Sequence, residues 1–202
     1  MNDIIEVDNI IPVDYQNHLL DTLTGWEFPW VLNKNIVSGD ECFKGMKSNP
    51  PGFNHFFYEK SAPVSNFFQL VYPLVLSITS QAKLPFNRLY RMRANLTLAN
   101  QKADSDMLMP HIDSFHPHWN AIYYVNDCDG DTIIFNETND DYDPGQKDID
   151  KIKSGEFTIK HRVTPKKGKL IAFPGKYYHT ASFCKEADYR CLININLGNV
   201  FV

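Results

Sequence analysis

The sequence predicts a mainly β protein with flanking helices (α+β in detail), built as a sandwich or barrel. Aromatic residues make up 13% of the chain, and their side chains pack well on pleated sheets. The 202 residues are enough for one domain with a buried core, and no linker divides them. Turn signals after Pro85 separate many short strand-like segments, expected at residues 87–99, 107–112, 119–126, 131–136, 156–163, 169–173, 177–183 and 189–199.

Two helices are expected in the first third of the chain. Residues 12–24 have the apolar spacing of a short amphipathic helix. A longer helix is expected over residues 62–81, with Ser61 as its N-cap and Pro63 in its first turn. Pro73 should kink that helix, because proline removes a backbone donor.

The remaining segments lack a regular pattern. Residues 26–60 are punctuated by Gly, Pro and Asn, which predicts loops with short strands. Residues 137–155 are polar and acidic, which predicts an exposed loop. We therefore expect one domain over 1–202, in which 1–84 form a helical and irregular support and 85–202 form the strand-rich core.

Charge and cysteine content narrow the class of protein. The formal net charge of −4 gives no overall basic field, which argues against a nucleic-acid partner and against an anionic membrane. No stretch reaches the 18 apolar residues of a membrane span, and the first residues do not resemble a signal peptide. We expect a cytoplasmic protein of open oligomeric state, with reduced thiols at Cys42, Cys128, Cys184 and Cys191.

A metal site is indicated by two histidines and one carboxylate. On an extended strand His111 and Asp113 project from the same face, and His179 is the best third ligand. Two imidazoles and a carboxylate leave three open coordination positions, which suits non-haem iron(II). A structural zinc site would need four closed ligands, commonly cysteines, and no cysteine adjoins these histidines. An HxD triplet alone is common, so the assignment depends on its context.

Three stretches supply that context: HID with WNAIYYVND, then DGDTIIF, then VTPKKGKLIAFPGKYYHTAS with DYRCLININL. Over about residues 85–199 the chain resembles the 2-oxoglutarate/iron(II) dioxygenase superfamily, and most closely its prolyl-hydroxylase-like branch. The resemblance implies a double-stranded β-helix, or jelly-roll, with the metal inside the barrel mouth.

The resemblance also implies roles for residues around the metal. Arg190, 11 residues after His179, would bind the distal carboxylate of 2-oxoglutarate. Four further residues would line the co-substrate: Tyr124, Asn120, Thr132 and Asn95.

The implied activity is hydroxylation of an unactivated C–H bond with Fe(II), 2-oxoglutarate and O2, releasing succinate and CO2. A peptidyl proline or a free amino acid is the first expectation for the substrate, with a modified nucleobase second. Residues 100–110 lack the YxxGxxFxxH pattern of prolyl 4-hydroxylases, which puts prolyl specificity in doubt.

Two other functions share these residues. A cupin-like jelly-roll could keep the metal without oxygenase activity, and a metal-dependent isomerase or hydrolase would react without oxygen. Four further side chains also have two interpretations, and a fifth has one. His116 and His118 either rim the pocket or act as extra ligands. His161 is expected to be a solvated strand residue, and Arg91 and Arg93 to form an outward basic face or to contact substrate.

Overall fold

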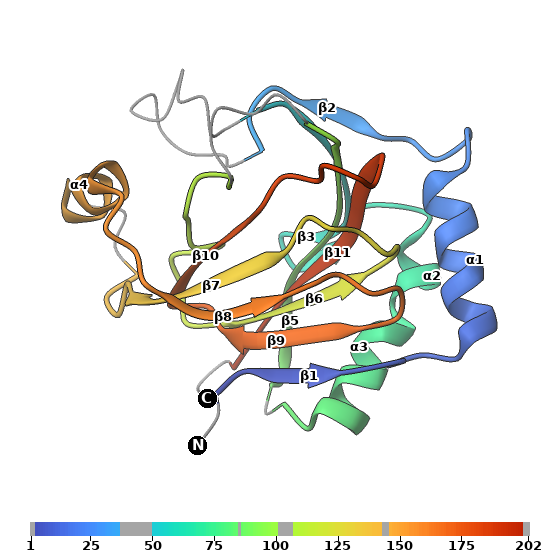
Figure 1. Cartoon of the computed structure of the whole chain (residues 1–202). Helices are drawn as coiled ribbons and strands as arrows, with labels where there is room; N and C mark the ends of the chain where they lie inside the picture. Colours follow the sequence, from blue (N-terminus) through green and yellow to red (C-terminus); the bar gives the residue numbers. More distant parts are fainter. Residues whose placement is uncertain (1–2, 37–49, 85, 101–106, 143–145, 200–202) are drawn as a thin grey trace.

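The protein is a two-sheet β structure with helices at its periphery, seen in a computed structural model that describes residues 3–36, 50–84, 86–100, 107–142 and 146–199 (Figure 1). The major sheet has eight strands in the order β1-β9-β6-β11-β5-β3-β2, with β4 paired to β3. Its strands are β1 Ile5–Val7, β2 Val31–Asn33, β3 Gly52–Glu59, β4 Ala62–Pro63, β5 Arg88–Leu98, β6 Trp119–Tyr124, β9 Leu170–Pro174 and β11 Tyr189–Gly198.

The minor sheet has three strands in the order β10-β7-β8. They are β7 Thr132–Thr138, β8 Ile159–Val163 and β10 Tyr177–Ala181. Every strand pairing described is antiparallel. Because antiparallel sheets that face each other enclose a space between them, this arrangement confirms the predicted jelly-roll with flanking helices.

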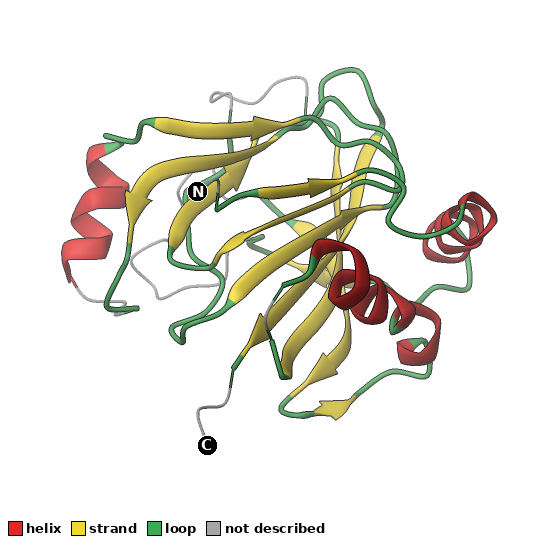
Figure 2. Cartoon of the chain, turned by 90° about the horizontal axis from the view of Figure 1, so that it is seen from below, coloured by secondary structure: helices red, strands yellow, loops and turns green. Residues whose placement is uncertain are grey.

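The helices lie on two opposite sides of the strands, as the view from below shows (Figure 2). They are α1 Val13–Thr24, α2 Phe68–Val71, α3 Pro73–Ser77 with a π-helical turn at Ile78–Ala82, and α4 Gln146–Ser154. The first three helices cover the outer face of the major sheet, where the largest apolar cluster lies, and α4 lies beyond the minor sheet (Figures 1 and 2). Within the described ranges, no helix combines the length and apolarity needed to cross a bilayer.

The two faces of the major sheet differ in chemistry because side chains alternate along each strand. On β11, Ile193 and Ile195 enter the outer apolar cluster, whereas Asn194 and Asn196 point between the sheets. The same alternation on β5 sends Met92 outward to the helices. The inner face carries a second apolar cluster that includes Ile122, Phe173 and Leu192, and beside it the polar residues of β5 and β11. Those polar residues place the site between the two sheets.

The first helix begins and ends within a residue of its expected bounds, but the second differs. Ala62–Pro63 form strand β4, and Ser61 has a left-handed φ of 64°, so Ser61 is no N-cap. The helix starts only at Phe68, after the Ser65 hydroxyl accepts the Phe67 N–H at 3.0 Å. Tertiary pairing of β4 with β3 overrides the local cap signal.

Two further expectations need correction. The expected loop 137–155 contains α4, whose Ile152 is buried against an apolar cluster with Phe135 and Tyr178. The expected strand 107–112 is reduced to two isolated bridges, Met107↔Ser182 and His111↔His179.

Candidate metal centre

His111 and His179 face each other across a single antiparallel bridge. The N–H of each residue donates to the carbonyl oxygen of the other, both at 3.0 Å, and the ring centroids are 4.5 Å apart. His179 is held by strand β10, so the bridge fixes His111 although its own segment forms no ladder. Two imidazoles from distant parts of the chain are thereby placed side by side.

The ring tautomers leave one nitrogen of each histidine free for a metal. His111 Nδ1 lies 3.1 Å from the carbonyl oxygen of Met109, and His179 Nδ1 lies 3.4 Å from that of Tyr177. Because a carbonyl oxygen only accepts, each Nδ1 carries the proton and each Nε2 presents a lone pair. Metal-binding histidines are commonly oriented by such a bond from the other ring nitrogen.

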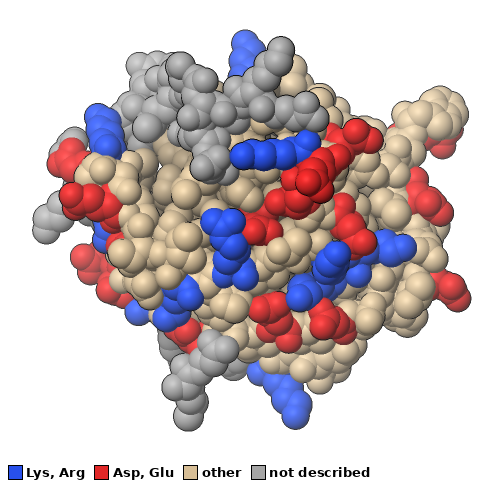
Figure 3. Space-filling model, in the orientation of Figure 1, with Lys and Arg blue, Asp and Glu red and all other residues tan. Residues whose placement is uncertain are grey.

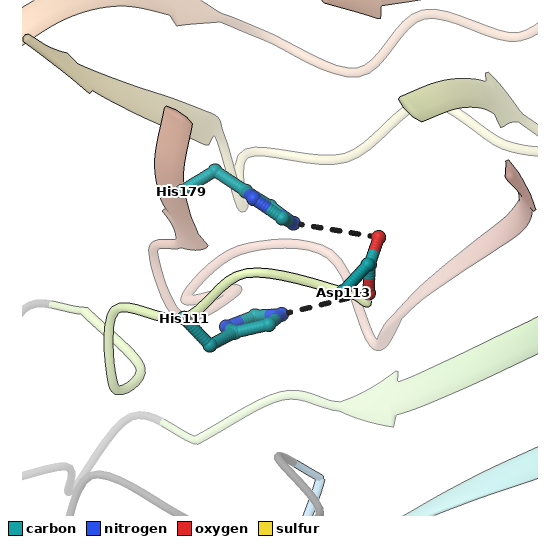
Figure 4. A group of neighbouring side chains, drawn as sticks. All are labelled: His111, Asp113 and His179. Carbon is teal, nitrogen blue, oxygen red and sulfur yellow. Dashed lines mark ion pairs between the residues drawn. The ribbon is translucent and has the colours of Figure 1, made fainter. Parts of the chain in front are cut away.

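Asp113 completes the group, and both imidazoles point toward its two carboxylate oxygens (Figure 4). His179 Nε2 is 3.7 Å from Oδ2, and His111 Nε2 is 4.0 Å from Oδ1. These distances are too long for hydrogen bonds, yet all three ligand atoms lie within 4.8 Å of one another. Donor atoms that converge without bonding one another fit a shared cation.

Four donors from β5 and β11 surround the Asp113 carboxylate, whose side chain is only 1% exposed. Arg91 Nη2 and Arg93 Nη2 lie 3.3 and 3.4 Å from Oδ1. Asn194 Nδ2 donates to Oδ2 at 2.8 Å, and Asn196 Nδ2 does so at 3.4 Å. The arginines therefore point inward, so the expected outward basic face is wrong.

The surroundings set the protonation states that a metal site requires. Burial has the largest effect on Asp113 and raises its pKa, but His179, Arg91 and Arg93 together hold that pKa well below its ordinary value. Burial, reinforced by His111, lowers the pKa of His179 to about 3, and burial also lowers the pKa of His111. At neutral pH the carboxylate is charged and both imidazoles are neutral, which are the ligating forms.

A second polar group lies deeper between the sheets. Arg190 Nη2 donates to Thr132 Oγ1 at 2.7 Å, and the Tyr124 hydroxyl donates to the same oxygen at 2.6 Å. Arg190 is buried, its Nε has no hydrogen-bond partner, and it forms no ion pair within the part of the chain that the structure describes. A buried guanidinium of this kind needs an anion.

One cavity of about 60 Å³ connects this group with the metal candidates. Arg190, Thr132 and Asn95 line it together with His111, Asp113 and His179. Tyr124 contacts this lining through the hydrogen bond from its hydroxyl to Thr132.

Asn120 lies elsewhere, and the register of β11 shows where. Successive inward residues are Arg190, Leu192, Asn194 and Asn196, about 7 Å apart along a strand. Asn194 and Asn196 contact Asp113, and Asn196 also donates to Asn120 Oδ1 at 2.6 Å. Asn120 is therefore on the opposite side of Asp113 from Arg190.

The loop behind Arg190 is closely packed. A Cβ on Gly130 would lie 2.8 Å from Cys184 Sγ, 3.0 Å from the Ser182 carbonyl oxygen and 3.2 Å from Arg190 Cδ. The Asp129 carboxylate accepts backbone N–H bonds from residues 185, 186 and 187, which ties the two loops together. Cys128, Cys184 and Cys191 are free thiols, whereas Cys42 lies outside the described residues.

The remaining histidines stand apart from the metal group. His118 Nδ1 is hydrogen-bonded to the His116 carbonyl oxygen at 2.6 Å. The ring packs directly on Gly175, where an added Cβ would lie only 2.3 Å from His118 Nε2. His116 is exposed. His161 Nε2 is hydrogen-bonded to Glu6 Oε1 at 2.7 Å on the surface.

The sequence left two interpretations for Arg91 and Arg93, an outward basic face or contact with substrate, and did not decide between them. The signal was present in the alternation of β5, since residues 91, 93 and 95 share one face and Asn95 was itself a site candidate.

Comparison with known proteins supports the fold. No family model and no curated protein matches the chain. Among solved structures, the alpha-ketoglutarate-dependent non-heme epimerase SnoN from nogalamycin biosynthesis has a TM-score of 0.63 at 14% identity, over 97% of this chain and 78% of that chain. HygX from Streptomyces hygroscopicus, solved with nickel and 2-oxoglutarate bound, has a TM-score of 0.57 at 12% identity, over 98% of this chain and 84% of that chain.

A prolyl hydroxylase from Trichoplax adhaerens, solved with a peptide of the hypoxia inducible factor oxygen degradation domain, has a TM-score of 0.58 at 11% identity, over 98% of this chain and 84% of that chain. The chain thus has the jelly-roll fold of the 2-oxoglutarate/Fe(II) oxygenases, prolyl hydroxylases included. The resemblance noted in the sequence is confirmed at the level of fold.

Proposed function

We propose that this chain is a 2-oxoglutarate- and Fe(II)-dependent dioxygenase that hydroxylates an unactivated C–H bond. The observation that carries the proposal is the convergence of His111, Asp113 and His179, in ligating form, on one cavity with the unpaired Arg190. These three residues would hold the metal. When bound, Fe(II) with 2-oxoglutarate and O2 supplies the oxidising power, and succinate and CO2 are released.

The protein's own residues would orient the co-substrate. Arg190 would bind the distal carboxylate, because its buried Nε lacks another partner in the described residues. Thr132 Oγ1 already accepts from both Arg190 and Tyr124, so its own proton is free to be donated to that carboxylate. Burial raises the pKa of Tyr124 to about 12, which keeps the phenol a donor at neutral pH. Fixing this end aims the co-substrate at the metal ligands.

A metal-binding jelly-roll without oxygenase activity explains less. Such a protein has no need of a buried cation beside its metal, and leaving Arg190 uncompensated would be costly. The Arg190–Thr132–Tyr124 group therefore favours the enzyme.

The substrate is proposed to be a small molecule or a peptide, with a peptidyl proline or an amino acid as the first candidates. The structural neighbours include a prolyl hydroxylase crystallised with a peptide, which supports a substrate of this size. On the face drawn in Figure 3, basic and acidic side chains are interspersed among the described residues, without a continuous basic surface for nucleic acid.

Anaerobic titration tests the cofactor assignment without knowledge of the substrate. Adding 2-oxoglutarate to the Fe(II)-loaded protein should produce a visible charge-transfer absorption, and admitting oxygen should then form succinate in an amount that depends on both additions. If 2-oxoglutarate binds without perturbing the metal, or fails to bind, the proposal is wrong.

A further inference from the structure

Arg91 and Arg93 have no part in holding the co-substrate, yet both reach into the metal centre. They come from adjacent inward positions of β5, opposite Asn196 and Asn194 of β11. Arg190 lies further along the same ladder, opposite Thr97. The guanidinium groups of Arg91 and Arg93 are therefore beside the metal ligand Asp113 and away from Arg190.

Two arginines for one carboxylate exceed what orienting Asp113 requires. Asn194 and Asn196 already donate to its Oδ2, and the metal would share the remaining charge. Arg91 also bonds to Asn196 Oδ1 at 2.9 Å and to the Asp113 carbonyl oxygen at 3.0 Å. Its side chain is 22% exposed, whereas that of Arg93 is 12% exposed. The pair therefore extends from the buried ligand toward solvent.

The formal charges of the loaded site do not balance. A divalent cation brings two positive charges and the three arginines bring three. Asp113 and Glu59, whose charge acts on Arg93 from β3, bring one negative charge each, and the co-substrate brings two. One positive charge is left over in a largely buried place, where an uncompensated charge is expensive.

A buried donor lacks a partner at the same place. Arg93 Nε is inaccessible to solvent and has no hydrogen-bond partner in the described residues, and Arg93 lines the same cavity as the three ligands. Arg190 Nε, beside Thr132, is likewise buried without a hydrogen-bond partner in the described residues. A surplus positive charge and an unfilled guanidinium donor both call for a planar anion that accepts hydrogen bonds.

We propose that Arg91 and Arg93 bind a carboxylate of the primary substrate, so that the substrate is an acid that presents the reacting C–H bond to the metal while its carboxylate is held beside Asp113. This inference rests on the proposed function, because it requires the metal and 2-oxoglutarate to occupy their sites. A free carboxylic acid such as an amino acid, and an acidic residue of a peptide, share this chemistry.

Fluoroacetate is a suitable probe because its ¹⁹F relaxation reports proximity to a paramagnetic metal. The protein is loaded with cobalt(II) and saturated with 2-oxoglutarate, which occupies Arg190 and leaves the Arg91–Arg93 pair open. Relaxation should be faster than in the same protein loaded with diamagnetic zinc. Acetate should reverse the effect, and acetamide, which has the same shape without charge, should not.

Variants assign the effect to the pair. Arg91→Gln and Arg93→Gln should each weaken fluoroacetate binding by at least about tenfold, since a hydrogen bond to a charged group is worth roughly 1.5–3 kcal/mol. Arg91→Lys, which keeps the charge, should weaken it less. Arg88→Gln is the matched control, because Arg88 lies on the same strand but donates to Ser61. Competition by free aspartate, compared with a terminally blocked peptide containing glutamate, tells the two sources of carboxylate apart.

Cobalt absorption and 2-oxoglutarate titration are recorded for every variant, so the two proposals fail differently. Wild-type protein that binds cobalt and 2-oxoglutarate but shows no acetate-sensitive relaxation overturns the anion site and leaves the proposed function intact. Equal relaxation in Arg93→Gln and wild type also overturns it. Absence of metal or 2-oxoglutarate binding in the wild type removes both. If a glutamine variant loses cobalt, Arg91→Lys replaces it in the comparison, and fluoroacetate binding as tight as in the wild type then overturns the anion site.

Discussion

The two faces of the major sheet are made from the same strands but have opposite tasks. Outward residues of β11 such as Ile193 and Ile195 are fully buried in the apolar cluster beneath the helices. Inward residues such as Arg190 and Asn194 are also buried, yet they carry charge or amide groups. Arg190 Nε and Asn194 Oδ1 have no hydrogen-bond partner among the described residues. The outer face therefore stabilises the fold, whereas the inner face combines a second apolar cluster with polar groups whose hydrogen bonds the described residues leave incomplete.

Removing a metal ligand should have the largest effect on the inner face. His111→Ala should abolish the charge-transfer absorption and reduce succinate formation to background, because two remaining ligands cannot hold the metal in place. The melting temperature of the metal-free variant should stay near that of the metal-free wild type. His116→Ala, at an exposed neighbouring histidine, is the control. Turnover at the wild-type level in His111→Ala would remove the metal assignment.

Removing the buried guanidinium should separate co-substrate binding from metal binding. Arg190→Ala should raise the 2-oxoglutarate concentration needed for half-saturation by about two orders of magnitude, the usual consequence of losing one partner of a buried charge pair. Cobalt affinity without 2-oxoglutarate should be unchanged. Arg162→Ala, on the surface of β8, serves as the comparison. An unaltered 2-oxoglutarate affinity would mean that Arg190 has another role.

A substitution on the outer face should do the reverse. Ile193→Ala should lower the free energy of unfolding by about 2–5 kcal/mol, because Ile193 is fully buried among apolar neighbours. Its 2-oxoglutarate affinity at low temperature should match the wild type. Leu192→Ala, one residue away but lining the cavity, should change that affinity. Denaturant unfolding and 2-oxoglutarate titration of both variants test the contrast, which fails if the two behave alike.

A smaller effect is expected where the inner face meets the loop behind it. Gly130→Ala should weaken 2-oxoglutarate binding by about tenfold, because the new methyl group would crowd Cys184 Sγ, the rigid Ser182 carbonyl and Arg190 Cδ. Adding Cys184→Ala removes the closest of these contacts and should restore part of the affinity. Titrations of the single and double variants with 2-oxoglutarate measure this. An unchanged affinity in Gly130→Ala would show that the loop moves to make room for the methyl group.

Low pH should destabilise the metal-free protein through the buried His179. The pKa of His179 falls from 6.5 to about 3 in the folded protein, first because of burial and then because of His111. Between these values the unfolded chain takes up a proton that the folded chain does not, so the metal-free protein loses stability as the pH falls from about 6.5. His179→Gln should flatten the dependence of melting temperature on pH over this range. An equally steep dependence in the variant would assign it to other groups.

The sequence predicted the strands after Pro85 well because their pattern is local, whereas β1 to β4 were not predicted individually. Turn residues and alternation placed β5 to β11 within a few residues of their bounds. His111 and Asp113 do lie together as expected, although their segment forms isolated bridges in place of the expected strand. Helix α4 was missed because its apolar face is too short to stand out from the acidic residues around it.

What the sequence could not provide was long-range register. The pairing of Arg93 with Asn194, which brings its guanidinium to Asp113, depends on how β5 and β11 align. The displacement of Asn120 from the Arg190 end follows from the same alignment, through its bond to Asn196. A shift of two residues in either strand would preserve every alternation and exchange these roles.

The single bridge between His111 and His179 has a consequence for how the protein matures. Without a continuous ladder, the segment before Asp113 is held by a few backbone hydrogen bonds. Metal binding would therefore stabilise the packing of this segment against β10. Amide protons of residues 107–113 should then exchange more slowly once the ion is loaded, while those of β11 should hardly respond. The metal ligands would thus become ordered after the two sheets have formed.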